Sequence, residues 1–326
     1  MTTKHSEQLS KFGSHKPISS VDCPMTSWKD TLLMIGHSPD LDDAFMFYAM
    51  VEEKIDLRGY RFRHVLQDIE SLNKQATRGE LHVSAVSIHA YAYLRDEYLL
   101  LPIGASIGDG YGPLLVAHHT TSVPSFFSLD DCRKWLLNQR IAVPGRTTTA
   151  YLTTRIFLGE FKHISVPFDK IFSTVKNGEA DVGLLIHEGQ LTYLRQGFKK
   201  VLDLGEWWKS YTQLPLPLGG NVIRKDIPPS VQRDIAEILR GSIQYGLQHQ
   251  SSAIEYSLPY ARGMGVALAH QFIRMYVNDY TLDYGRKGCQ ALERLFSEAY
   301  RVGVVSPLIL PQFAYGKEPH LLQENL

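Results

Sequence analysis

Short apolar runs alternate with longer amphipathic segments in the first third of the chain. We interpret the runs as strands, and the segments, in which apolar positions recur every three or four residues, as helices. The expected order is strand 31–36, helix 42–53, strand 60–66, helix 68–78 and strand 81–87. This alternation predicts a parallel sheet with right-handed crossovers, and therefore an α/β fold.

A second α/β unit follows a strand at 112–119 that leaves the first unit. It is expected to contain strand 140–144, helices 148–158 and 168–177, and strands 180–187 and 201–204. After a loop at 214–220 and a strand at 221–224, the pattern is helical over residues 230–248, 252–264, 267–277 and 285–302. Because these helices have no strands among them, we expect them to return and cover the first unit.

The pattern therefore predicts two lobes with a ligand cleft between them. Residues 30–118 and 220–305 would form a large α/β lobe, and residues 122–210 an inserted small α/β lobe. Residues 1–28 are interpreted as a flexible N-terminal extension, and residues 306–326 as a C-terminal tail. The two segments that cross between the lobes would form a hinge.

Composition and charge exclude several classes of protein. The 326 residues include 34 Lys plus Arg and 34 Asp plus Glu, so neither nucleic acid nor a membrane surface is expected as a partner. No apolar run approaches the roughly 18 residues of a membrane span, and the first thirty residues lack a signal peptide's apolar region. Cys23, Cys132 and Cys289 are too scattered for a disulfide framework or a zinc site. We expect a cytoplasmic protein without a metal, whose oligomeric state the sequence leaves open.

His187 is the candidate catalytic residue. It follows the apolar run of residues 182–186, which predicts a strand buried on both faces. Ligands of α/β sheets bind just beyond the carboxyl ends of strands, and a neutral imidazole is an effective general base near pH 7. The alternative is a histidine that is hydrogen-bonded in the core.

Helix starts after two strands supply candidate ligand-binding groups. Thr147, Thr148 and Thr149 follow the strand at 140–144, where unpaired backbone N–H groups and hydroxyls would suit a carboxylate. The alternative is that one of these threonines simply caps the helix. Ser87 stands at a similar place after the strand at 81–87, with the same alternative.

The turn after the first predicted strand carries three carboxylates and a histidine. Asp40, Asp42 and Asp43 do not form a calcium loop, so helix capping is the better interpretation for at least one of them. His37 and Ser38 are expected to face the mouth of the cleft.

Residues 104–108, GASIG, match the G-x-S-x-G pattern of a hydrolase nucleophile. That pattern requires a helix directly after the serine, and the following DGYGP cannot continue as one, so we reject a hydrolase. The chain also lacks the glycine-rich motifs that bind nucleotide cofactors.

Several of these segments, in this order, resemble the menaquinone biosynthesis family of the futalosine pathway, and most closely its 1,4-dihydroxy-6-naphthoate synthases. The motifs that carry the resemblance are GHSP at 36–39, FMFYA at 45–49, VPGRTTTAY at 143–151, LIHE at 185–188, LTY at 191–193 and LPLPLG at 214–219. The resemblance implies the two-lobed periplasmic-binding-protein-like (type 2) fold.

The resemblance also implies an activity and assigns roles to residues. A lyase of this family converts cyclic dehypoxanthine futalosine to 1,4-dihydroxy-6-naphthoate without a cofactor, and His187 matches its proton acceptor. The substrate is an aromatic carboxylate, which would suit the helix start at Thr147–Thr149. The substrate-binding residues that the resemblance implies are Ala85, Val86, Ser87, Thr149 and Ala150.

The chain departs from the typical synthase in two places. Residues 38–45 read SPDLDDAF where the synthases typically read SPCPNDTF, so Asp40 and Asp42 replace a cysteine and an amide. Ala85 stands where a lysine is common. Two alternatives therefore stay open at this point: a noncatalytic cytoplasmic protein that binds a small carboxylate, and a paralogue of the same fold such as a chorismate dehydratase.

Overall fold

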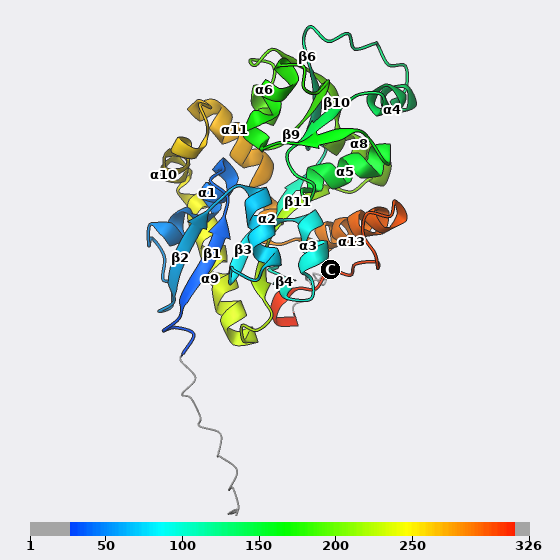
Figure 1. Cartoon of the computed structure of the whole chain (residues 1–326). Helices are drawn as coiled ribbons and strands as arrows, with labels where there is room; N and C mark the ends of the chain where they lie inside the picture. The colour runs from blue at the N-terminus through cyan, green and yellow to red at the C-terminus, as the bar shows by residue number, and fades with distance from the viewer. Residues whose placement is uncertain (1–26, 317–326) are drawn as a thin grey trace, which may run out of the picture.

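The computed structural model describes residues 27–316, which form two α/β lobes, each built on its own sheet (Figure 1). The first sheet has the strand order β2-β1-β3-β11-β4, and β5 also pairs with β11. Its strands are β1 (Leu32–His37), β2 (Arg61–Leu66), β3 (Val83–Ser87), β4 (Tyr98–Leu100), β5 (Ser106–Gly108) and β11 (Leu216–Arg224). We call this part the large lobe.

Within the large lobe, β1 runs parallel to both β2 and β3, as the sequence predicts, whereas β11 runs antiparallel to β3, β4 and β5. Leu33 and Ile35 of β1 pack in the core formed with helices α1 and α9, and Met34 packs with α2 on the opposite face. The helices of this lobe are α1 (Leu41–Val51), α2 (Ile69–Thr77), α3 (Ile88–Leu94), α9 (Pro229–Gln248), α10 (Gln250–Ser257), α11 (Val266–Tyr276), α12 (Asp279–Leu282) and α13 (Gly285–Arg301).

The second sheet belongs to the small lobe and has the order β10-β6-β9-β7-β8. Its strands are β6 (Leu114–His118), β7 (Ile141–Val143), β8 (His163–Ser165), β9 (Val182–Leu185) and β10 (Phe198–Asp203). β7 is parallel to β8 and β9, and β6 is antiparallel to β9 and β10. The helices here are α4 (Leu129–Leu137), α5 (Thr149–Leu158), α6 (Ile171–Lys176), α7 (Gly189–Thr192) and α8 (Leu204–Thr212).

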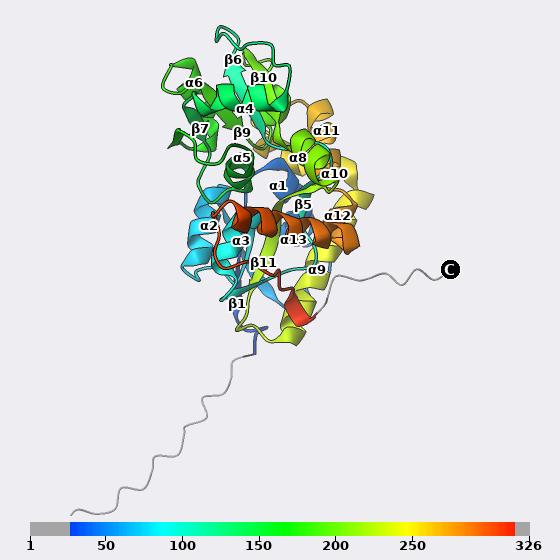
Figure 2. The ribbon, with the colours of Figure 1, turned by 90° about the vertical axis from the view of Figure 1, so that its right-hand side faces the viewer.

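Two small-lobe helices, α5 and α8, also join the core of the large lobe. Leu152 and Ile156 of α5 and Trp208 of α8 are buried in one cluster with Tyr284 and Phe296 from the α13 region. Figure 2 shows α5 and α8 between the small-lobe sheet and α13. The lobes are therefore joined by apolar packing beside the two chain crossings.

The structure corrects several details of the sequence prediction. Residues 214–220 were expected to form a loop, but β11 already begins at Leu216 and continues as one nine-residue strand. The helix expected over 168–177 is a 3₁₀ turn, Phe168–Lys170, followed by the shorter α6. Strands β4, β5 and β8 and helices α4, α8 and α12 were not predicted.

Most of the predicted extension at 1–28 and the last ten residues of the predicted tail lie outside the described residues. The lobe boundaries drawn from the sequence stay predictions.

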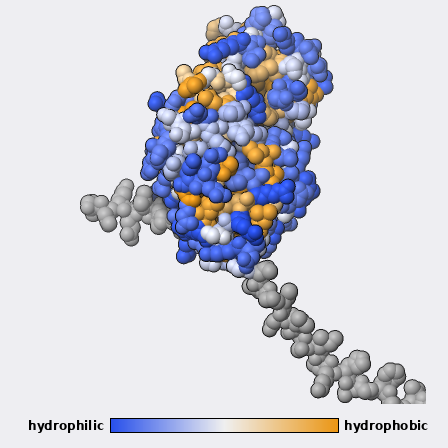
Figure 3. Space-filling view, turned by 90° about the vertical axis from the view of Figure 1, so that its left-hand side faces the viewer, coloured by the Kyte–Doolittle hydropathy of each residue, from blue (hydrophilic) through white to orange (hydrophobic). Residues whose placement is uncertain are grey.

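Among residues 27–316, no helix is long and apolar enough to cross a membrane. On the face drawn in Figure 3, hydrophilic residues predominate and apolar residues gather in separate patches.

Candidate functional site

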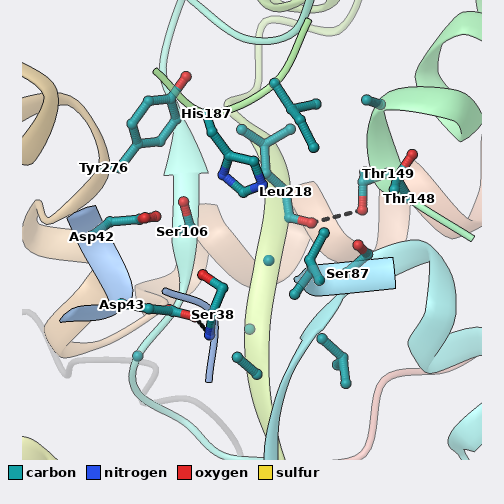
Figure 4. A pocket seen from close by; sticks show the side chains of 18 of the residues that line it. Ser38, Asp42, Asp43, Ser87, Ser106, Thr148, Thr149, His187, Leu218 and Tyr276 are labelled. Atoms are coloured by element: carbon teal, nitrogen blue, oxygen red, sulfur yellow. Dashed lines mark hydrogen bonds between the residues drawn. The ribbon is translucent and has the colours of Figure 1, made fainter. Parts of the chain in front are cut away.

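A pocket lies between the lobes, close to the carboxyl ends of β1, β3 and β9 (Figure 4). The large lobe contributes Ser38, Asp42, Ala85, Val86, Ser87 and Ser106 to its lining. The small lobe contributes Thr148, Thr149, Ala150 and His187. Strand ends and a helix start from both lobes thus meet in one pocket, which is where α/β folds bind ligands.

His187 lies at the edge of the pocket, two residues after the end of β9. Its φ of 53° is in the left-handed region, a conformation that costs a residue with a Cβ about 1 kcal/mol. The imidazole packs edge-to-face against Phe168, with 5.2 Å between ring centroids. In Figure 4 the ring points into the pocket between Tyr276 and Leu218. The structure thus places His187 at a pocket beyond a strand end, and its catalytic role stays a prediction.

Three charged side chains, contributed by both lobes, form a cluster beside His187. Asp40 Oδ2 is 3.2 Å from His187 Nε2, while Asp40 Oδ1 is 2.8 Å from Nη1 of Arg262. The same Nη1 is 2.8 Å from Glu188 Oε1, and the guanidinium lies over the ring of Phe168, 4.3 Å from its centroid. Asp40 occupies the N-cap position of α1, but its side chain makes no capping hydrogen bond. Its carboxylate therefore contacts Arg262 and His187 and does not cap the helix.

Asp42 and Asp43 lie in the first turn of α1 and line the pocket. Burial, together with the neighbouring Asp43 charge, raises the pKa of Asp42 to about 7. Burial also raises the pKa of Asp43 to about 6, although this carboxylate accepts a 2.6 Å hydrogen bond from the Ser38 N–H. Oδ1 of Asp42 is buried without a hydrogen-bond partner among the described residues. Neither carboxyl caps α1 in the manner expected from the sequence.

The three threonines before and within α5 differ in their contacts. Thr148 is the N-cap and accepts a hydrogen bond from the N–H of Tyr151, as the capping alternative predicts. Thr149 donates to the carbonyl of Leu218 at 2.7 Å. Thr147 donates to Glu70 Oε2 at 2.6 Å and lies outside the pocket lining. The structure therefore brings Thr148 and Thr149 to the pocket, but not Thr147.

Ser87 lies at the junction of β3 and α3, with Asn73 of α2 fixing its orientation. The Asn73 side chain donates to Ser87 Oγ at 3.2 Å and accepts from the Ser87 N–H at 2.9 Å. Ser87 does not cap α3 with its side chain. Because a hydroxyl can donate while it accepts, Ser87 Oγ stays able to donate to a ligand.

Two other histidines, His37 and His89, are buried outside the pocket lining. His37, expected at the cleft mouth, instead stacks on Phe47 and lies 3.0 Å from a nitrogen of His64. Burial lowers the pKa of His37 to about 3. His89 lies 3.3 Å from the carbonyl of Thr148, and burial lowers its pKa to about 4. Both are therefore neutral packing residues near pH 7.

Sequence reasoning missed several residues of the site. Ser106 lines the pocket and begins the short strand β5, so no helix follows the serine of GASIG as a nucleophile elbow requires. Tyr276 donates a hydrogen bond to Gln190, and both line the pocket. Arg262 comes from the segment between α10 and α11. Among the described residues, no group of three or more His, Cys, Asp or Glu is arranged to hold a metal ion.

Two sheet-based lobes with a pocket between them define the class of periplasmic-binding-protein-like folds, as the sequence predicts. The alkanesulfonate-binding protein of Xanthomonas axonopodis pv. citri, solved with MOPS, has this fold. It superposes with a TM-score of 0.64 at 10% identity and covers 86% of this chain and 96% of its own. Residues 33–301 match the sequence profile of the menaquinone biosynthesis family. The chain belongs to that family.

Curated relatives agree with this membership. A 1,4-dihydroxy-6-naphthoate synthase of Thermus thermophilus is 37% identical over 281 residues, which are 86% of this chain and 98% of the relative. Its counterpart in Streptomyces coelicolor is 32% identical over 282 residues, 85% of this chain and 95% of the relative. A crystal structure of an Archaeoglobus fulgidus protein is 44% identical, with a TM-score of 0.77, and covers 84% of this chain and 98% of its own.

Proposed function

We propose that this protein is a 1,4-dihydroxy-6-naphthoate synthase, a carbon–carbon lyase that acts on cyclic dehypoxanthine futalosine in menaquinone biosynthesis. The names of its two curated relatives support this activity, since each is aligned over nearly its whole length. The observation that carries the proposal is the placement of His187 at a pocket enclosed by both lobes. A family member that only bound a carboxylate would not need a base there.

In the proposed reaction, His187 removes a proton from the sugar-derived ring of the substrate. Carbon–carbon cleavage and elimination then leave the aromatic naphthoate, and aromatisation supplies driving force. Apolar side chains of the pocket, including Met46, Val86, Ile186 and Phe272, would enclose the aromatic part of the substrate and exclude water. A water-poor site strengthens the interactions that orient the reacting groups.

The substrate carboxylate would bind at the N-terminus of α5. The first turn of a helix presents unpaired N–H donors and the positive end of the helix dipole. Thr149 and Ala150 bring this turn to the pocket, and Ser87 lies at the pocket from the opposing lobe. A donor set from two lobes binds its ligand fully only when the lobes are together, so binding and enclosure would be coupled.

Incubation of the purified protein with cyclic dehypoxanthine futalosine, followed by chromatography and mass detection, tests the proposal. We expect 1,4-dihydroxy-6-naphthoate to appear in proportion to enzyme concentration. Binding of the substrate without any product would indicate a carboxylate-binding protein. Conversion of chorismate in place of the futalosine derivative would indicate the paralogous dehydratase.

A further inference from the structure

We propose that Asp40 is a positioning residue, which holds His187 through Nε2 so that Nδ1 is the nitrogen that accepts the substrate proton. This inference rests on the proposed function, because it assigns a partner to the base of that reaction. It concerns a residue outside the pocket lining, on the N-terminal side of α1.

Asp40 Oδ2 and His187 Nε2 are both buried, which supports a direct interaction between them. Asp40 is 1% exposed, and its Oδ2 lies 3.2 Å from His187 Nε2. The two atoms are not aligned as a hydrogen bond, and each is otherwise a buried polar atom without a partner among the described residues. Leaving two buried polar atoms unpaired is destabilising, and a small rotation of the imidazole would pair them. Pairing is therefore the arrangement that the fold favours.

Arg262 supplies the counter-charge of the buried Asp40 carboxylate. Its Nη1 is 2.8 Å from Asp40 Oδ1, which leaves Oδ2 directed at the imidazole. A buried carboxylate without a counter-charge is strongly destabilising, so the arginine supplies the charge that the site requires. The same Nη1 contacts Glu188, which keeps the guanidinium between the two lobes. Asp40 can thus act as a fixed acceptor for His187.

The backbone of His187 supports the same assignment. Its φ of 53° is a conformation that residues with a Cβ rarely adopt, and such strain persists when surrounding contacts enforce it. Here the ring is held between Asp40 and the edge-to-face contact with Phe168. The strain therefore places the imidazole where the large lobe can hold one nitrogen.

Other charged groups around His187 do not provide the same contact. Asp42 of α1 faces the imidazole electrostatically, but burial and Asp43 raise its pKa to about 7, so its negative charge is partial near neutral pH. Glu188 and Arg262 face each other, and Arg262 reaches the imidazole only through Asp40 and Phe168. Asp40 is the carboxylate at contact distance from the ring.

Asp40→Asn and Glu188→Gln form a matched pair of variants for the test. Each removes one carboxylate that lies 2.8 Å from Arg262 Nη1, but only Asp40→Asn removes the carboxylate beside His187. We expect Asp40→Asn to lower kcat at least about tenfold with a smaller change in KM. It should also move the acid limb of the kcat/KM profile about one pH unit lower, because a nearby carboxylate favours protonated imidazole. Glu188→Gln should leave that limb in place.

A substrate-free titration separates this inference from the proposed reaction. Histidine NMR of the free protein, with His187 assigned by its loss in His187→Ala, should show the same downward shift in Asp40→Asn and not in Glu188→Gln. If this shift occurs in a protein that makes no naphthoate, the positioning role stands and the proposed reaction fails. Equal shifts in both variants, or none in either, overturn the positioning role.

The wild-type protein provides a second measurement if Asp40→Asn does not fold. Nitrogen chemical shifts of His187 above its titration range report which nitrogen carries the proton. A single tautomer with the proton on Nε2 supports the proposal, since Asp40 can accept only from that nitrogen. A tautomer with the proton on Nδ1 overturns it.

Discussion

At the scale of single residues, the buried aspartates of α1 make the free energy of unfolding depend on pH. Burial raises the pKa of Asp42 from 3.8 to about 7 and that of Asp43 to about 6. A carboxyl whose folded-state pKa is raised stabilises the fold while it is protonated, and this contribution is lost as the pH rises from about 4 through about 7. The protein therefore gives up stability to keep acidic groups at the pocket.

Asp42→Asn should remove most of this pH dependence. We expect the variant to unfold with nearly the wild-type free energy at pH 4 and to become more stable than the wild type as the pH rises. The difference should be on the order of a few kcal/mol above pH 7. Urea unfolding at pH 4 to 8 measures it, with Asp96→Asn as an exposed control. A difference that does not change with pH would contradict the burial of an ionisable Asp42.

Single residues of the site were predictable where they follow a local pattern. His187, Ser87, Ser38 and Thr149 all stand where a predicted strand ends or a helix starts. Tyr276, Gln190 and Arg262 have no such local signal, because only the tertiary fold brings the first two to the pocket and Arg262 to Asp40.

Among the elements, α8 packs against the first crossing between the lobes through a contact between two glycines. Gly112 precedes β6, and Gly205 lies in the first turn of α8, shortly before β11. A Cβ on Gly205 would overlap the backbone of Tyr111 and Gly112, whereas one on Gly112 would lie 3.0 Å from Gly205 Cα. Two backbones approach here closely enough that no side chain fits between them.

Gly205→Ala is therefore expected to force α8 away from the crossing at Tyr111 and Gly112. We predict a loss of about 2–3 kcal/mol in the free energy of unfolding, within the usual cost of overpacking. Gly241→Ala is the matched control, since that helical position leaves a Cβ 3.6 Å from Ile55 and alanine favours a helix. Chemical denaturation of both variants would show the difference. An unchanged free energy of unfolding in Gly205→Ala would mean that α8 is not tightly packed against this crossing.

Elements with a clear period were predicted well, and several of the shortest ones were not. The strands before and after α2 match their predicted positions to within about two residues. β4, β5 and β8 have three residues each, too few to show an alternation. β11 was truncated in the prediction because its first residues, Leu-Pro-Leu-Gly-Gly, have the composition of a loop, although they pair with β5 and β3.

At the scale of the whole molecule, hydrogen bonds between the lobes support the enclosed pocket. Thr147 of the small lobe donates to Glu70 of the large lobe and accepts from Asn73 at 3.2 Å. Thr149 accepts from the N–H of His89 at 3.1 Å. These contacts lie at the N-terminus of α5, so they hold the proposed carboxylate site against the large lobe.

Thr147→Val should weaken this closed arrangement. Loss of both hydrogen bonds of the hydroxyl, worth about 1 kcal/mol each, predicts roughly a thirtyfold rise in KM with little change in kcat. Thr147→Ser keeps the hydroxyl and is the control. A double-mutant cycle with Glu70→Ala, read out in KM, should show that the two effects are not additive. Additive effects would indicate that Thr147 acts on the substrate directly, as the sequence suggested.

We propose that His187, at a pocket between two lobes, performs acid–base chemistry on the substrate. Naphthoate formation from cyclic dehypoxanthine futalosine by wild type, His187→Ala and the exposed control His119→Ala tests it most directly. We predict a loss of at least about a hundredfold for His187→Ala, the lower range for general acid–base catalysis, and wild-type rates for His119→Ala. A folded His187→Ala variant that forms naphthoate at the wild-type rate would contradict the proposed role of His187 as the general base.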